Sequence, residues 1–234
     1  MQVPDVPHRR LPGRQQEARS NDSAVLAAAR EVFSTRGSDA SMAEVAQRAG
    51  VGVGSVYRRY PTKEALIEAL RVSAVSEAAA LAHEVAADAD AQTDAGSDAG
   101  ADSDTIAESG GAVATFLRRQ ILGAAGPNLQ PTGGGAGKSS AALAAASDYL
   151  HEGLERLVAR DLAHGLVPAG FTAADVMQLL LHLRPVLPIP RSRADELHLR
   201  YLGFVMRGLV EQARAGIPVD DGPDWAEWLG AWHD

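Results

Sequence analysis

Cysteine is absent from the 234-residue sequence, and lysine occurs only at Lys63 and Lys138. Without cysteine the chain has no disulfide, no thiolate zinc site and no redox-sensing thiol, which fits a reducing cytoplasm. No segment reaches the roughly 20 consecutive apolar residues that a membrane span requires, and the N-terminus lacks the apolar core of a signal peptide. We therefore expect a cytoplasmic protein with no membrane partner.

Negative charge predominates, with a formal net charge of −8, but it is spread unevenly. The first 64 residues hold ten Lys and Arg and seven Asp and Glu, a net charge of +3, which leaves −11 for the rest. A basic N-terminal module on an acidic body is expected when only one end of a protein meets phosphate groups.

The alternation of apolar and polar residues that marks a strand is also missing, so the expected fold class is all-α. Helices are predicted over 22–35, 42–49, 53–60, 62–87, 105–122, 139–164, 172–183, 193–215 and 223–232. An Asp-rich stretch over 88–104 and a Gly- and Pro-rich stretch over 123–138 are predicted as flexible loops. The expected domains are a disordered basic tail over 1–20, a DNA-binding domain over 21–66 and a helical domain over 67–234.

Residues 41–60 have the pattern of a helix-turn-helix. Ser41 and Glu44 form a predicted capping box, Ala46 is small enough for two helices to cross, and Gly50 supplies the positive φ of the turn. The apolar residues expected to pack these helices onto the preceding one are Leu26, Ala29, Phe33, Val45, Ala49, Val51, Val53 and Val56. The result is a three-helix unit with one helix facing outward.

The outward helix is short and begins with Gly52 and Gly54, which leave backbone amides open to phosphate. Hydroxyl and guanidinium donors follow along the same helix. The predicted DNA-contacting residues are Ser41, Gly52, Val53, Gly54, Ser55, Tyr57, Arg58, Arg59 and Lys63. Because one short recognition helix reads few base pairs, we expect a homodimer on a palindromic operator in double-stranded DNA.

Residues 22–70 resemble the N-terminal domain of the TetR family of transcriptional repressors, through "AAREVFSTRG" and "SMAEVAQRAGVGVGSVYRRYPTKEAL". The resemblance implies that Tyr57 and Lys63 contact phosphates and that Ser55 holds the family's hydroxyl position before the tyrosine. Gly52 departs from the serine that is common in the family, which removes one possible phosphate contact. Tyr60 stands where phenylalanine is common, a conservative aromatic exchange.

The resemblance also implies a C-terminal region that dimerises and binds a small-molecule effector, whose identity the sequence leaves open. A two-helix dimer face is predicted from the stripe Leu179, Leu180, Leu183, Leu199, Leu202, Phe204, Val205 and Leu209. Phe116, Tyr149, His151 and Met177 either line an effector pocket or pack in the core. The expected function is a ligand-responsive transcriptional regulator, most simply a repressor that leaves its operator when the effector binds; an activator has the same sequence features.

Alternatives remain open at two points. Arg9, Arg10, Arg14 and Arg19 belong either to a disordered basic tail or to an arm that enters the minor groove. A helical small-molecule carrier or enzyme with a vestigial helix-turn-helix is the alternative function. The sequence contains no nucleophile–base pair, no complete phosphate-binding loop and no metal-ligand spacing, so we expect no enzyme activity, no catalytic residue, no cofactor and no metal.

Overall fold

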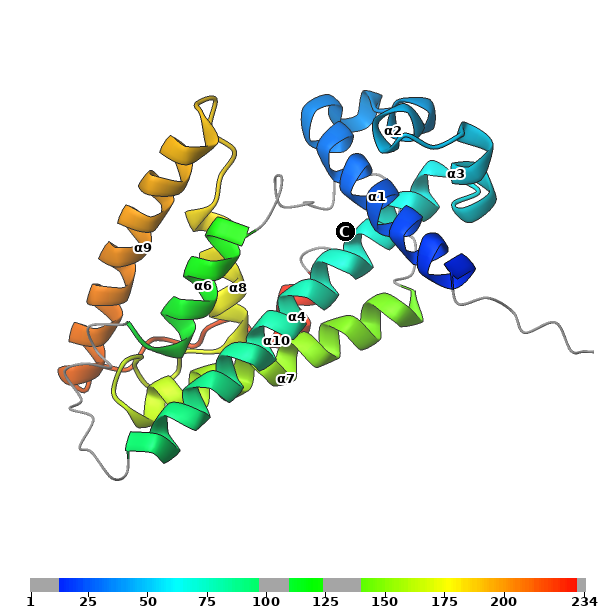
Figure 1. The fold of residues 1–234 in the computed structure, drawn as a ribbon. Helices are drawn as coiled ribbons and strands as arrows, with labels where there is room; N and C mark the ends of the chain where they lie inside the picture. Colours follow the sequence, from blue (N-terminus) through cyan, green and yellow to red (C-terminus); the bar gives the residue numbers. More distant parts are fainter. Residues whose placement is uncertain (1–12, 97–109, 124–139, 231–234) are drawn as a thin grey trace, which may run out of the picture. The chain divides into compact units, whose positions relative to one another are not determined.

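The computed structural model describes residues 13–96, 110–123 and 140–230, and within them it contains helices and no strand (Figure 1). The predicted all-α class is thereby confirmed. The chain divides into two compact units, Met1–Leu70 and Arg71–Asp234. The boundary falls inside one long helix, α4.

The N-terminal unit is built on α1 (Gly13–Arg36), α2 (Met42–Ala49), α3 (Val53–Arg59) and the first turns of α4 (Lys63–Gly96). A 3-10 turn over Gly37–Asp39 joins α1 to α2; α2 packs on α1, and α3 packs on α2. The side chains buried at the centre of this unit are Ala29, Phe33, Val45, Ala46, Val56, Leu66 and Leu70. Removal of these apolar groups from water is the main force that holds the helices of this unit together.

Helix α1 begins earlier than the sequence analysis expects. Residues 13–20 continue the helix instead of forming part of a tail. The physical reason is local, because this segment contains no proline after residue 12 and is rich in Arg, Gln, Glu and Ala, which are good helix formers. Arg9 and Arg10 lie outside the described residues.

The second unit contains most of α4, together with α6 (Gly111–Gly123), α7 (Ala141–Ala163), α8 (Ala173–Leu183), α9 (Arg191–Arg214) and α10 (Trp225–Gly230). Helix α6 is central, since it packs against α7, α8 and α9 (Figure 1). Its buried residues lie on more than one face and include Val113, Phe116, Leu117 and Ile121. A helix that is apolar on several sides must be enclosed by other helices.

Asp161 holds the start of α6 in place. Its two carboxylate oxygens accept hydrogen bonds from the amides of Ala112 and Val113, each 2.9 Å long. Gly111 has a φ of +80°, and a Cβ there would lie 2.6 Å from Asp161 Oδ2, so only glycine fits. Burial raises the pKa of Asp161 although the two amide bonds act in the opposite direction.

Helix α4 continues through Gly96, so residues 88–96 are helical where the sequence analysis expects a loop. Alanine favours helix, and Asp90 forms ion pairs with Arg156 at 2.7 Å and Arg160 at 3.5 Å on α7. These contacts come from a distant part of the chain and are invisible in the local composition. The remainder of the predicted loop, 97–104, and residues 124–138 of the second loop lie outside the described residues.

The predicted dimer stripe on α8 and α9 points mainly into the unit itself. Leu180, Leu183 and Leu202 are buried in its core, whereas Phe204 is 48% exposed. A sequence shows that a helix has an apolar face but not which neighbour covers it. Here α6 covers much of that face, and the surface available to a second chain on α9 is carried by Tyr201 and Phe204.

Candidate nucleic-acid interface

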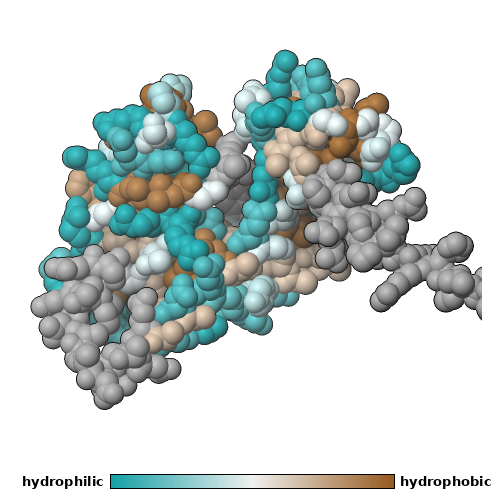
Figure 2. All heavy atoms as spheres, in the orientation of Figure 1, coloured by the Kyte–Doolittle hydropathy of each residue, from teal (hydrophilic) through white to brown (hydrophobic). Residues whose placement is uncertain are grey.

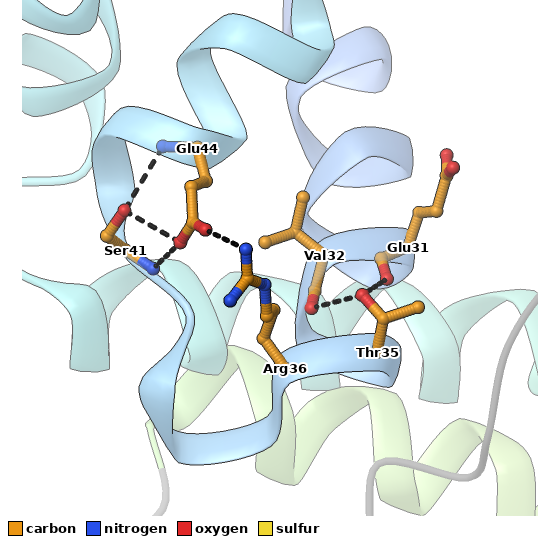
Figure 3. Close-up of polar contacts among 6 residues, drawn as sticks. All are labelled: Glu31, Val32, Thr35, Arg36, Ser41 and Glu44. Atoms are coloured by element: carbon orange, nitrogen blue, oxygen red, sulfur yellow. Dashed lines mark hydrogen bonds and ion pairs between the residues drawn. The ribbon is translucent and has the colours of Figure 1, made fainter.

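The start of α2 is fixed by Ser41 and Glu44, as the sequence predicts. The Ser41 hydroxyl accepts from the Glu44 amide at 3.2 Å, and the Ser41 amide donates to Glu44 Oε2 at 2.9 Å (Figure 3). The bond from the Ser41 amide is the largest influence holding the pKa of Glu44 below its ordinary value. Arg36 reaches the other carboxylate oxygen at 3.2 Å, which ties the end of α1 to the start of α2.

The turn between α2 and α3 depends on Gly50. Gly50 has φ +69° and ψ +24°, the left-handed conformation that favours glycine. Its amide donates to Gln47 O at 3.2 Å, and the Val51 amide donates to Ala46 O at 3.0 Å, which closes the end of α2. The chain then reverses direction and enters α3 at Val53.

Helix α3 turns one side inward and leaves the rest in solvent. Val56 is 1% exposed and Tyr60, just after the helix, is also buried. The prediction that Val53 packs inward is wrong, because its side chain is 44% exposed. Residues three apart share a helix face, so the helical period alone predicted Val53 and Val56 on the same side. Val53 is the first residue of α3, at the end of that face, and is left uncovered there. Tyr57, one turn after Val53, is exposed on the same side.

Cations gather at the end of α3. The Arg58 guanidinium lies 3.5 Å from the Ser55 hydroxyl, and both side chains are exposed. Arg59 forms an ion pair of 2.5 Å with Asp22 on α1, so this cation also joins α3 to α1. The Lys63 ammonium lies 5.4 Å from the centre of the Phe33 ring. From Val45 to Lys63 the sequence contains four cations and no acidic residue, and two of these cations, Arg48 and Arg59, pair with Glu31 and Asp22 of α1.

The two glycines at the start of α3, Gly52 and Gly54, are not required by the conformation or packing of the described residues. Gly52 is the N-cap with φ −67°, and neither it nor Gly54 has a positive φ. A Cβ added at either position meets no described atom within 4 Å. Neither backbone conformation nor internal packing therefore requires glycine at these two positions.

The predicted effector-pocket residues lie in different surroundings in the structure. Phe116 is fully buried and Met177 is partly buried against the same core. Tyr149 is exposed and stacks on His83 of α4 with ring centres 3.9 Å apart, whereas His151 stacks on Trp225 at 4.6 Å. Tyr149 and His151 face different directions on α7. Phe116 and Met177 thus belong to the core, whereas Tyr149 and His151 have ring contacts with different helices.

The sequence alone did not reveal two ion pairs at this site, because each joins side chains of two different helices. Asp22, which pairs with Arg59, lies in α1 and has no motif of its own. No motif identifies Arg36 either, although a cation near the C-terminus of a helix is a common feature that sequence patterns can show.

In the described residues no group of three or more His, Cys, Asp or Glu side chains is placed to hold a metal ion. No described helix has both the length and the apolar character needed to cross a membrane.

An outward helix after a glycine turn, on a unit with a cationic edge, defines a helix-turn-helix DNA-binding domain joined to a larger helical unit. Comparison with protein families gives the same answer: residues 25–70 match the model of the bacterial regulatory proteins of the tetR family. The resemblance of this segment is confirmed: residues 25–70 are similar to the N-terminal domain of the tetR family of bacterial regulatory proteins.

One solved structure extends the likeness to the second unit. A TetR transcription regulatory protein from Mycobacterium vanbaalenii is 27% identical, with a TM-score of 0.54, over 85% of this chain and 99% of the other. A TetR transcriptional regulator from Streptomyces coelicolor is 24% identical, with a TM-score of 0.49, over 80% and 97% of the two chains. The search of curated proteins gave no match.

Proposed function

We propose that this protein is a cytoplasmic repressor that binds a palindromic operator as a homodimer and releases it when a small molecule binds to the second unit. The observation that carries the DNA-binding part is α3, whose exposed surface bears Val53, Ser55, Tyr57 and Arg58 within a segment, 45–63, that contains four cations and no acidic residue. An exposed short helix with hydroxyl and guanidinium donors is suited to the major groove of duplex DNA.

The proposed contacts divide into two groups. Tyr57, Arg59 and Lys63 contact phosphates, as does the backbone around Gly52, and these contacts give affinity without sequence preference. Val53, Gly54, Ser55 and Arg58 face the base edges and give specificity. Ser41 stands apart from both groups, because its hydroxyl already donates to Glu44 Oε2 at 2.9 Å. We expect Ser41 to act chiefly through the position of α2.

Selection of bound oligonucleotides by the purified protein tests the operator. We expect a palindrome whose half-sites are centred about one DNA turn, 10 to 10.5 base pairs, or a multiple of it apart. A random set of sequences, or no retention at low salt, contradicts the proposal.

A salt titration on the selected duplex tests the phosphate contacts. Lys63→Ala removes one proposed contact from each half of the dimer, so the slope of log K against log salt becomes shallower by about 2. Arg118→Ala, an exposed cation on α6, is the matched control and leaves the slope unchanged. An equal effect of the two variants removes the role proposed for Lys63.

The dimer is proposed to form through the outward side of α9. Tyr201 and Phe204 are exposed there with ring centres 6.0 Å apart, and the guanidinium groups of Arg200 and Arg207 each lie 5.2 Å from the Phe204 ring centre. Aromatic and arginine side chains are enriched at protein interfaces. Figure 2 shows apolar side chains at the surface of the second unit between polar ones.

Release by an effector rests on the family resemblance and on the helical second unit, which we propose as a non-enzymatic ligand-binding unit. Phe116 and Met177 remain the candidate pocket residues that adjoin the core, while Tyr149 and His151 lie on its outside. A ligand that prefers one conformation of this unit shifts the whole protein toward it. Addition of a true effector is expected to raise the melting temperature and to weaken operator binding in the same concentration range.

A further inference from the structure

Val53 is an apolar side chain that faces solvent beside the exposed polar side chains of Ser55 and Arg58. It is 44% exposed at the first position of α3, whereas Val56 in the same helix is 1% exposed. Figure 2 shows apolar side chains reaching the surface of the N-terminal unit around α3. Exposed valine contributes little to the fold of this unit, so an outside partner explains its presence better than internal packing does.

Gly52 and Gly54 on either side of Val53 support the same conclusion. Gly54 lies inside α3, where glycine lowers the stability of a helix relative to alanine, whereas Gly52 is the N-cap, a position that glycine suits. No described atom lies within 4 Å of an added Cβ at either position, and neither glycine has a positive φ. The cost at Gly54 is therefore not imposed by the fold. Bare backbone on both sides of one valine lets a partner surface come close to that side chain.

An excess of positive charge favours a polyanion as the partner. Arg48, Arg58, Arg59 and Lys63 lie in a segment, 45–63, without an acidic residue, and two of them, Arg48 and Arg59, pair with carboxylates of α1. In the major groove of duplex DNA the base edges present hydrogen-bond donors and acceptors, and the one apolar group is the C5-methyl of thymine. An exposed valine between two glycines matches that group, and it has no comparable counterpart on the phosphate backbone.

We propose that Val53 reads a thymine in each half of the operator by contact with its C5-methyl group. This inference rests on the proposed function, because it requires α3 to enter the major groove. It adds the chemical identity of one base that the helix recognises. Tyr57, one turn further along the same side, then meets the backbone next to that thymine.

The experiment combines a protein change with a change of one methyl group in the DNA. The operator is first selected with the wild-type protein, and each thymine of a half-site is then replaced in turn by deoxyuridine, symmetrically in both halves. Dissociation constants are measured for the wild-type protein and for Val53→Ala, which has the higher helix propensity and keeps the exposed position. Val186→Ala, a change at a more exposed valine in the second unit, is the matched control.

Burial of one methyl group corresponds to about a fourfold change in affinity, so two half-sites give about 15-fold. We expect one symmetric thymine pair whose replacement weakens the wild-type protein and the Val186→Ala variant by this factor, while Val53→Ala binds both duplexes alike. The proposal is overturned if no thymine is sensitive, or if Val53→Ala keeps the full sensitivity. Failure of the wild-type protein to bind any duplex at low salt instead refutes the proposed function itself.

Discussion

Asp161 is the single residue on which the second unit depends most clearly. It is 1% exposed, accepts two amide hydrogen bonds at the start of α6 and stands next to a glycine that no other residue can replace. Loss of its carboxylate leaves two buried amides without an acceptor, and each such group costs about 1 to 3 kcal/mol.

Asp161→Ala is therefore expected to lower the free energy of unfolding of the second unit by about 2 to 4 kcal/mol. All three tryptophans of the chain lie beyond residue 220, so tryptophan fluorescence during urea denaturation reports on this unit. Asp148→Ala, an exposed aspartate of the same helix, is the control and is expected to change little. Equal effects of the two substitutions contradict the assigned role.

The raised pKa of Asp161 gives this contribution a pH dependence with a definite sign. A carboxyl whose pKa is higher in the folded state binds its proton more tightly there, so folding is favoured most below the ordinary value of 3.8. The advantage of the wild-type protein over Asp161→Ala is expected to shrink as pH rises above that value. The midpoints of urea denaturation of both proteins, between about pH 4 and pH 7, measure this difference in stability. A difference that grows as pH rises contradicts the account.

Residues whose role is local could be predicted, and residues paired across the fold could not. Ser41, Glu44 and Gly50 act within one helix end, so their spacing was enough to predict the capping box and the turn. Asp22 and Arg59 are brought together only when α3 packs within the N-terminal unit. Their spacing along the chain follows no pattern from which the pair could be predicted.

At the scale of elements, α3 combines weak local stability with an exposed surface. Gly54 lies inside a helix of seven residues, and a Cβ added there would meet no described atom within 4 Å. We interpret this weakness as the consequence of a surface shaped for close approach to DNA rather than for a stable helix.

Gly54→Ala tests this interpretation because it separates stability from binding. The substitution is expected to raise the free energy of unfolding of the N-terminal unit by about 0.5 kcal/mol, since alanine is the better helix former. Operator affinity is expected to fall at least tenfold, because the new methyl group occupies space needed by the DNA. Circular dichroism melting and fluorescence anisotropy measure the two effects, and an affinity equal to that of the wild-type protein refutes the close approach.

The limits of helices were predictable where end signals were strong. Helix α2 has the predicted bounds, Met42–Ala49, because a capping box and a glycine define its two ends. Helix α4 runs beyond its predicted end, since an Ala- and Asp-rich sequence is compatible with both helix and loop until Asp90 meets two arginines of α7. The position at which α4 ends therefore depends on its contacts with α7, and local composition carries no information about those contacts.

At the scale of the whole molecule, the proposed function requires two copies of the chain. The exposed pair Tyr201 and Phe204 is expected to be covered in the dimer, whereas the leucines of α8 and α9 already serve the core. The sequence showed two apolar helices but assigned too many of their residues to the dimer surface.

Phe204→Lys is expected to convert the dimer to monomer, because an ammonium group in an apolar interface loses its hydration, and the nearby Arg200 and Arg207 repel it instead of pairing with it. Sedimentation velocity measures the change, and the fold survives because Phe204 is 48% exposed in the single chain. Leu162→Lys, at a similarly exposed apolar residue near the end of α7, serves as the control and stays dimeric. Retention of the dimer by Phe204→Lys places the interface elsewhere.

The DNA-binding role could be inferred from sequence because its residues lie within one short segment, and the effector site could not. Phe116, Tyr149, His151 and Met177 come from different helices, and their surroundings depend on how α4, α6, α7, α8 and α10 pack. A mixture of polar and apolar residues on a helix is equally typical of a pocket wall and of a core edge.

The central claim is that α3 enters the major groove twice on one duplex. Because the natural chain has no cysteine, Ser55→Cys provides a single exposed thiol on α3 to which an iron chelate that cleaves DNA is attached. The account predicts two cleavage sites on the selected operator, about one helical turn or a multiple of it apart, and none from the same reagent on Asp148→Cys in the second unit. A bound duplex left intact by the Ser55 conjugate, or cut equally by both conjugates, contradicts it.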